Sequence, residues 1–259
     1  MTISIIAIFG LLIGSFLNVC VYRVPRKMSV VTPVRSFCPD CSAGLSWWEN
    51  MPLLSWVFLR GKCSHCKKPI SGRYPLIEAL SSIAALASYQ RFGLTPTALL
   101  VYVLSSSLIV ISFIDLEFKI IPNVISFPGM TIGLLLGIVS QYRPGLFLPI
   151  MTQGAADSLI GFLVGGGFFY IIGEFYYRVT KREGLGGGDI KLMAMTGAIL
   201  GWRSVPPTIF VGSTFGAVAG IAWMIIKRGN RQMEIPFGPW LAIGTLLYLF
   251  CDLPFFRFY

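Results

Sequence analysis

The chain has 259 residues, of which 55% are hydrophobic and only 12% are charged. Soluble globular proteins carry about 25% charged residues, so this composition excludes an ordinary soluble domain and indicates a chain solvated largely by lipid. Disordered chains are poor in apolar and aromatic residues, which excludes intrinsic disorder as well. The formal net charge of +10 would suit a nucleic-acid partner, and the placement of the charges decides that question.

Eight apolar stretches are candidate membrane spans, since roughly 20 apolar residues in a helix cross the hydrocarbon core and fewer suffice inside a protein. The first stretch lacks a basic start and a small-residue cleavage site, so we expect a retained helix rather than a signal peptide. The predicted fold is an all-α polytopic membrane protein. Its candidate spans are Ile3–Tyr22, Pro75–Gln90, Pro96–Ile114, Pro122–Ser140, Ala155–Tyr177, Ile190–Trp202, Pro206–Ile226 and Pro236–Cys251.

The basic residues set the orientation of these spans. All but four of the 21 Lys and Arg residues follow the first, third, fifth and seventh spans, and the four exceptions are Arg91, Arg143, Arg203 and Arg257. Cytoplasmic loops carry the excess of Lys and Arg, so both termini are expected to face away from the cytoplasm. Topology therefore explains the net charge without nucleic acid, and the basic face would also favour anionic lipid headgroups.

One polar segment, residues 23–74, is long enough to fold outside the membrane. It contains two CxxC pairs separated by 21 residues, Cys38 with Cys41 and Cys63 with Cys66. Four thiolates at this spacing are typical of a structural zinc site, and a segment this small gains from a metal. Disulfides or redox thiols are the alternative, against which a cytoplasmic location counts. We expect a nearby aromatic cluster to pack the segment on the membrane face, with a substrate groove as the alternative: Trp47, Trp48, Trp56 and Phe58.

An ionisable residue in or beside a span is a candidate for function, because its desolvation must be offset. Two such acids, Asp115 and Asp189, are expected at the cytoplasmic membrane edge although they lie 74 residues apart in sequence. Two carboxylates that share a proton can activate water and polarise a peptide carbonyl, which is the chemistry of an aspartyl protease. The structural alternatives are a helix-end pair of Asp115 with Lys119 and a helix N-cap at Asp189. The other acids of this kind are Glu78, Asp157 and Glu174; we expect Asp157 at an exposed helix start and Glu174 as a buried partner of a basic residue.

Glycines precede Asp189 in the run Gly184-Leu185-Gly186-Gly187-Gly188. Without Cβ atoms, these glycines can adopt positive φ and can let a substrate backbone approach closely. The run is not a phosphate-binding loop, because no GxxxxGK[ST] pattern follows a strand.

In this order the motifs resemble those of the bifunctional type IV prepilin leader peptidases and N-methyltransferases, membrane members of the GxGD aspartyl proteases. The matching patches span nearly the whole chain. Besides the two CxxC pairs they are Gly14-Ser15-Phe16-Leu17-Asn18-Val19, Tyr22-Arg23-Val24-Pro25, Gly61-Lys62-Cys63, Arg73-Tyr74-Pro75-Leu76-Ile77-Glu78, Asp115 with Ile121-Pro122-Asn123, Gly186-Gly187-Gly188-Asp189-Ile190-Lys191 and Pro236-Phe237-Gly238-Pro239.

The resemblance implies that Asp115 and Asp189 are the catalytic pair, supported by Gly186, Gly188 and Lys191. It implies cleavage of a basic leader from prepilins or pseudopilins at the cytoplasmic face of a bacterial inner membrane. It also implies methylation of the new N-terminal amine with S-adenosylmethionine as the donor. The methyltransferase candidates are Gly61, Lys62, Glu78 and Asn18, although Glu78 is favoured as a structural partner of Arg73 or Arg23, and Asn18 is equally open to a helix-packing role.

The predicted organisation is a first helix over 1–22, a cytoplasmic zinc-binding loop over 23–74 and a seven-helix bundle over 75–259. Two other classes of function remain open. A transporter would use the carboxylates for cations, but no internal repeat supports it. A non-enzymatic, zinc-stabilised assembly factor for a pilus or secretion machine is the second rival.

Overall fold

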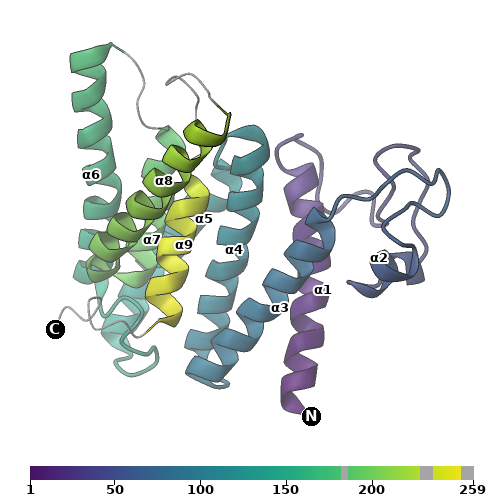
Figure 1. Cartoon of the computed structure of the whole chain (residues 1–259). Helices are drawn as coiled ribbons and strands as arrows, with labels where there is room; N and C mark the ends of the chain where they lie inside the picture. The colour runs from purple at the N-terminus through teal and green to yellow at the C-terminus, as the bar shows by residue number, and fades with distance from the viewer. Residues whose placement is uncertain (182–185, 228–235, 252–259) are drawn as a thin grey trace. The chain divides into compact units, whose positions relative to one another are not determined.

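A computed structural model describes residues 1–181, 186–227 and 236–251. Within these ranges the chain is helical without a strand (Figure 1), and two isolated β-bridges occur in the loop after the first helix. Two short helices, η1 (Trp48–Asn50) and α2 (Leu54–Phe58), lie in that loop. The longer helices are α1 (Thr2–Arg23), α3 (Arg73–Phe92), α4 (Pro96–Phe118), α5 (Asn123–Tyr142), α6 (Ala155–Thr180), α7 (Gly187–Leu200), α8 (Val205–Lys227) and α9 (Gly238–Phe250).

Each of the eight predicted spans coincides with one of these longer helices, which confirms the all-α, multi-pass prediction. Among the residues that the structure describes, five helical segments are long and apolar enough to cross a membrane, and α9 is apolar but shorter. The number of spans therefore stays a prediction. Four arginines that entered the orientation argument, Arg182, Arg228, Arg231 and Arg257, lie outside the described residues.

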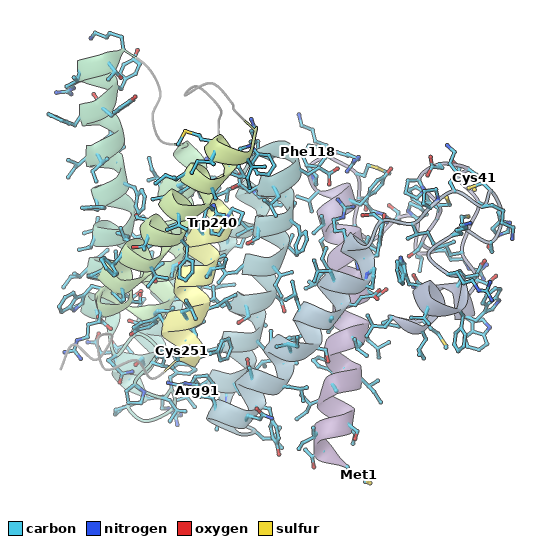
Figure 2. All side chains as sticks on the ribbon, in the orientation of Figure 1. Met1, Cys41, Arg91, Phe118, Trp240 and Cys251 are labelled. Carbon is cyan, nitrogen blue, oxygen red and sulfur yellow. The ribbon has the colours of Figure 1, made fainter. Side chains whose placement is uncertain are left out.

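The chain forms two compact units, Met1–Val110 and Ile111–Tyr259. In the first unit α1 and α3 run antiparallel, and Met1 and Arg91 lie at the end of this pair away from Cys41 (Figure 2). The backbones approach so closely that a Cβ at Gly14 would lie 2.6 Å from the Cα of Glu78. Ser81 Oγ donates a hydrogen bond of 2.8 Å to the carbonyl of Gly10. Small residues and hydroxyl bonds are the usual means of packing helices in a membrane.

The second unit is built around α7, in which every residue from Leu192 to Leu200 is buried. Helices α5 and α6 pack on it through glycines, since a Cβ at Gly133 would lie 2.7 Å from the backbone of Ala198. Gly161 likewise faces the backbone of Gly197. A helix that is covered on all sides has no polar face. The short sixth apolar stretch, which shows no polar face, therefore suits a helix buried in the protein.

The loop between α1 and α3 is anchored by a buried charge at the end of α1. Arg23 is only 3% exposed, and its guanidinium donates to the carbonyls of Ser29, Pro33 and Arg35 at 3.1, 2.9 and 3.5 Å. The guanidinium also lies 5.6 Å from the ring centre of Phe37. Five N–H donors in a fixed fork allow one arginine to bind several carbonyls, so Arg23 fixes the path of the chain toward Cys38.

Replacing Arg23 with Lys should loosen this path, because a lysine ammonium cannot reach three separate carbonyls in the geometry of the fork. Hydrogen bonds to a charged group contribute about 1.5–3 kcal/mol each, so local opening becomes much more frequent. We expect faster limited proteolysis within residues 29–36 of the detergent-solubilised protein. Arg26→Lys is the matched control, since exposed Arg26 donates to the carbonyl of Tyr22, only four residues before it. Equal proteolysis of both variants would contradict the anchoring role.

Candidate active site and metal centre

Asp115 lies in the last turn of α4 with a side chain that is 6% exposed. The helix stops after Phe118, where Lys119 adopts a φ of 55° and its N–H bonds to the carbonyl of Asp115 at 2.9 Å. This left-handed residue is a common helix end, and it turns the chain toward Ile121 and the start of α5. One oxygen of the Asp115 carboxylate, Oδ2, accepts a 3.0 Å hydrogen bond from the backbone N–H of Gly238 at the start of α9.

Asp189 lies in the first turn of α7 and is 7% exposed. Its N–H bonds to the carbonyl of Gly186 at 3.0 Å. A carboxylate in the first turn of a helix is stabilised by the helix dipole, so the position is favourable for a charge. The Asp189 side chain lies within electrostatic range of Asp115. Two acids from distant parts of the sequence thus come together in the second unit.

The side chain of Ile121 packs against two helix starts beside the acids, that of α7, which carries Asp189, and that of α9, which binds Asp115. A Cβ at Gly188 would lie 2.9 Å from the Cβ of Ile121, and a Cβ at Gly238 would lie 2.8 Å from Asp115 Oδ2 and 3.4 Å from Ile121 Cδ1. Ile121 therefore packs against the N-terminal ends of both α7 and α9. A larger residue at Gly188 would push α7, and Asp189 with it, away from Asp115.

The glycines directly before Asp189 have ordinary negative φ angles or extended backbone, not the left-handed conformation that glycine allows. Gly186 has a φ of −67°, and positive φ occurs at none of Gly186, Gly187 and Gly188. The positive φ that glycine allows is therefore not used at these three residues, while Gly184 lies outside the described residues. Glycine is required at Gly188 because the side chain of Ile121 lies too close for a Cβ atom. A Cβ at Gly186 would lie 3.2 Å from Asp189 Oδ2, whereas a Cβ at Gly187 would meet nothing within 4 Å.

Lys191 links α7 to α5 beside this site. Its Nζ donates a 2.9 Å hydrogen bond to Asn123 Oδ1 and lies 5.6 Å from the ring centre of Phe127. The two other candidate acids of the second unit, Asp157 and Glu174, have ordinary partners. Asp157 accepts a 2.9 Å bond from the Gln153 N–H at the start of α6. Glu174 pairs with Arg178 at 2.7 Å, as predicted, but the pair is exposed rather than buried because it faces outward from α6.

The four cysteines of the loop form one cluster, since their sulfur atoms all lie within 4.8 Å of one another. Cys38 Sγ and Cys66 Sγ are 3.9 Å apart. A tetrahedral ion with bonds of about 2.3 Å requires sulfur atoms about 3.8 Å apart, so the cluster fits a metal of this kind. His65 is not one of the four donors; its ring lies 3.9 Å from Glu49 instead, as expected of a residue outside the ligand set.

The two CxxC turns have the same local geometry. In each turn the fourth residue after the first cysteine has positive φ, which is 58° at Ser42 and 61° at Lys67, and its N–H bonds back to the carbonyl of that cysteine. Backbone N–H groups also point at the sulfur atoms. The N–H of Cys66 is the main cause that lowers the pKa of the Cys63 thiol to about 7. Desolvation and the neighbouring thiols raise the pKa of the Cys66 thiol to about 11, so easy ionisation is not shared by the whole cluster.

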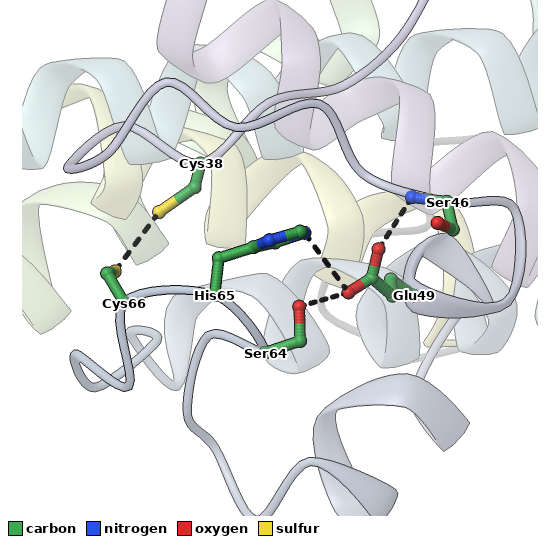
Figure 3. A network of polar contacts seen from close by, with 6 residues as sticks. All are labelled: Cys38, Ser46, Glu49, Ser64, His65 and Cys66. Carbon is green, nitrogen blue, oxygen red and sulfur yellow. Dashed lines mark hydrogen bonds and ion pairs between the residues drawn. The ribbon is translucent and has the colours of Figure 1, made fainter.

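Glu49 joins the second turn to the preceding chain (Figure 3). Its carboxylate is 6% exposed and accepts hydrogen bonds from Ser64 Oγ and from the Ser46 N–H, the latter at 2.6 Å. These bonds, that of Ser64 foremost, lower the pKa of the Glu49 carboxyl. The sequence analysis missed this residue. The pattern Ser46-Trp47-Trp48-Glu49 is a helix capping box, which would have pointed to the bond between Glu49 and the N–H of Ser46.

Two methyltransferase candidates lie on the facing surfaces of α1 and α3. Asn18 is 4% exposed and donates from Nδ2 to the carbonyls of Tyr74 and Gly14, whereas its buried Oδ1 has no hydrogen-bond partner among the described residues. Glu78 accepts a 2.8 Å hydrogen bond from the Leu53 N–H, so its partner is a backbone amide of the loop. The sequence had favoured an arginine, Arg73 or Arg23, as this partner. Arg23 is occupied by three carbonyls instead.

The other two candidates lie on the loop. Gly61 has a φ of 65°, and a Cβ there would lie 3.0 Å from the indole of Trp56. Both the backbone conformation and the close indole require glycine at this turn. Lys62 is exposed beside it. Trp56 also donates from its indole nitrogen to the carbonyl of Ile70 at 3.2 Å, which closes the turn.

Comparison with known proteins agrees with this arrangement. The model of the bacterial peptidase A24 N-terminal domain matches residues 8–92, and that of the type IV leader peptidase family matches residues 102–221. The chain belongs to the type IV leader peptidase family. The first match contains α1, the cysteine loop and α3, and the second contains both aspartates.

Curated relatives carry the name prepilin leader peptidase/N-methyltransferase. The chain is 37% identical to the protein of Xanthomonas campestris pv. campestris over 93% of this chain and 88% of that one. The Pseudomonas putida protein is 34% identical, over 96% and 91% of the two chains. The Myxococcus xanthus protein is 41% identical, over 86% of this chain and 63% of its own length. No solved structure matches the chain.

Gly188→Ala should lower the thermal unfolding midpoint of the purified protein, because the new Cβ overlaps Ile121 in a packed site. Overpacking of this kind costs about 1–3 kcal/mol. Gly187→Ala is the matched control, since its Cβ would meet nothing, and alanine in a helix is favoured over glycine by roughly 0.5–1 kcal/mol. A midpoint for Gly188→Ala at or above that of Gly187→Ala would show that the contact with Ile121 is unimportant.

Proposed function

We propose that this protein is a membrane-embedded enzyme that removes the basic leader of type IV prepilins or pseudopilins and then methylates the new N-terminal amine. The observation that carries the proposal is the meeting of Asp115 and Asp189, two buried acids at adjacent helix ends. Membership of the leader peptidase family and the names of the relatives support it. The transporter and the non-enzymatic assembly factor are not favoured.

In the proposed cleavage step the two acids divide the work. The ionised member accepts a proton from water as the water attacks the scissile carbonyl, and the protonated member donates a hydrogen bond to the developing oxyanion. The hydrogen bond from the Gly238 N–H orients the Asp115 carboxylate. The position of Asp189 in the first turn of α7 adds a favourable dipole. Gly186, Gly188 and Lys191 hold the α7 end in place.

The substrate segment beside the cut in such prepilins is itself an apolar helix, so we propose that it enters laterally from the bilayer. The asymmetry of Lys and Arg residues supports a bacterial inner-membrane location with both acids at the cytoplasmic face. A basic face of this kind would also contact anionic lipid headgroups.

We assign the methyltransferase role to the first unit. S-adenosylmethionine supplies an activated methyl group for the substrate amine. The substrate amine donates hydrogen bonds and needs acceptors to orient it. Asn18 Oδ1 on α1 and the Glu78 carboxylate on α3 are buried hydrogen-bond acceptors. Gly61 and Lys62 complete the set from the loop, with Gly61 acting through the shape of its turn.

Asp115→Asn and Asp189→Asn should each abolish cleavage of a prepilin peptide, since an amide cannot exchange the proton that the reaction needs. We expect losses of about 10²–10⁴-fold or more, measured by mass spectrometry of the cleaved peptide. Asp157→Asn is the control, because its carboxylate binds a backbone N–H at the start of α6. Adding the methyl donor to the wild type should then increase the product mass by one methyl group. Normal processing by either dyad variant defeats the assignment.

We further propose that the four-cysteine cluster holds a structural zinc ion through Cys38, Cys41, Cys63 and Cys66. Zinc favours four thiolates in tetrahedral geometry, and the sulfur separations match. The ion would replace the apolar core that this loop lacks.

Cys38→Ser with Cys63→Ser should remove the metal, since two of the four thiolates are lost and serine is a poor ligand for zinc. The purified wild type should contain one zinc per chain by elemental analysis, and the double variant close to none. Cys20→Ser is the control, because this thiol lies on α1 apart from the cluster. Stoichiometric zinc in the double variant would contradict the ligand set.

A further inference from the structure

The loop of the first unit contains a cavity that the family resemblance does not assign. Its volume is about 340 Å³, within the range of small-molecule sites. Residues of four kinds line it: the basic Arg35, the aromatic Trp47, the aliphatic Val34 and Leu45, and the polar Ser36, Ser46 and Asn50. A wall that combines a cation, an indole and amide or hydroxyl groups is suited to a polar aromatic ligand.

The lining side chains are available for a ligand. Trp47 is 80% exposed, so its ring faces are open to a stacking partner. No hydrogen bond or ion pair within the described ranges engages the side chain of Arg35 or of Asn50, although the Arg35 carbonyl is held by Arg23. A face made only for contact with lipid tails would be apolar, whereas this one presents a free guanidinium and a free carboxamide.

The walls of the cavity are fixed on both sides. The Arg35 side is held by the guanidinium of Arg23. The Ser46 side is held by Glu49, which also binds Ser64 between two of the clustered cysteines (Figure 3). A site whose backbone is held in this way is preorganised for binding.

The cavity also adjoins the chain that leads to the acceptors on α3. Leu53, three residues after Asn50, donates its N–H to Glu78, and Glu78 packs against α1 at Gly14. The lining residue Asn50 and the Glu78-bound Leu53 are therefore only three positions apart along the chain. A methyl donor and its acceptor must meet, so this continuity points to the donor as the ligand.

We propose that this cavity is the binding site for the adenosine and amino-acid parts of S-adenosylmethionine; the inference rests on the methyltransferase half of the proposed function. The indole of Trp47 stacks on the adenine ring, as aromatic side chains do with bases. The fork of Arg35 binds the carboxylate of the methionine part. The Asn50 carboxamide hydrogen-bonds the edge of the base or the ribose hydroxyls.

The test measures binding directly, by calorimetric titration of the full-length, detergent-solubilised protein with S-adenosylhomocysteine, the product form of the donor. Trp47→Ala and Arg35→Ala should each weaken binding by about tenfold or more. Trp48→Ala is the matched control, because this neighbouring indole does not line the cavity, and its affinity should stay within about twofold of the wild type. Arg35→Lys keeps the charge without the fork and should fall between wild type and Arg35→Ala.

A second measurement covers the case in which a variant fails to fold. Ultraviolet crosslinking of the radiolabelled donor to the wild type, followed by peptide mapping, should label residues 34–50. Labelling elsewhere, or equal affinity of the wild type and both Ala variants, overturns the inference and leaves the proposed methyltransferase function intact. A wild type that neither binds the product form nor methylates a cleaved peptide overturns that function itself, and the inference with it.

Discussion

Two carboxylates are buried at the end of α4 and the start of α7, and the second unit is organised around keeping them there. A carboxylate removed from water needs compensating partners, because its desolvation is otherwise too costly. The protein supplies a backbone N–H at Gly238 for Asp115 and a helix start for Asp189. Both partners belong to helix N-termini, where unpaired N–H groups are available. The ends of three helices must therefore meet for the acids to be tolerated at all.

Close backbone approach makes that meeting possible. Ile121 fills the space beside Gly188 and Gly238, and the same glycine-to-backbone packing recurs where α5 and α6 contact α7 at Gly133 and Gly161. In a membrane, apolar side chains gain little from leaving lipid, so helices associate through van der Waals contact between small residues. The position of Asp189 is thus fixed by packing along the whole of α7 and not only by the loop before it.

Much of this arrangement was predictable from the sequence, and the predictions that failed did so for identifiable physical reasons. Apolar runs located every long helix, since length and hydropathy are strong signals, and CxxC spacing located the cysteine cluster. Glycine freedom was the wrong explanation for Gly188, because sequence does not distinguish a residue that needs positive φ from one that needs no Cβ. Glu174 was placed correctly with a basic partner, yet which face of α6 turns outward depends on packing that no local pattern contains.

The cysteine loop also depends on buried charged side chains whose partners are backbone groups. It has few buried apolar residues, and three buried charged side chains bind its backbone: Arg23 at its start, Glu49 in its middle and Glu78 from α3. Each satisfies peptide groups that a larger domain would pair in regular structure. These charges bind backbone groups, and within the described part of the chain the side chains of Arg35 and Asn50 beside Trp47 stay unengaged. A loop held together through its main chain can present a polar, aromatic surface to a ligand without loss of its own stability.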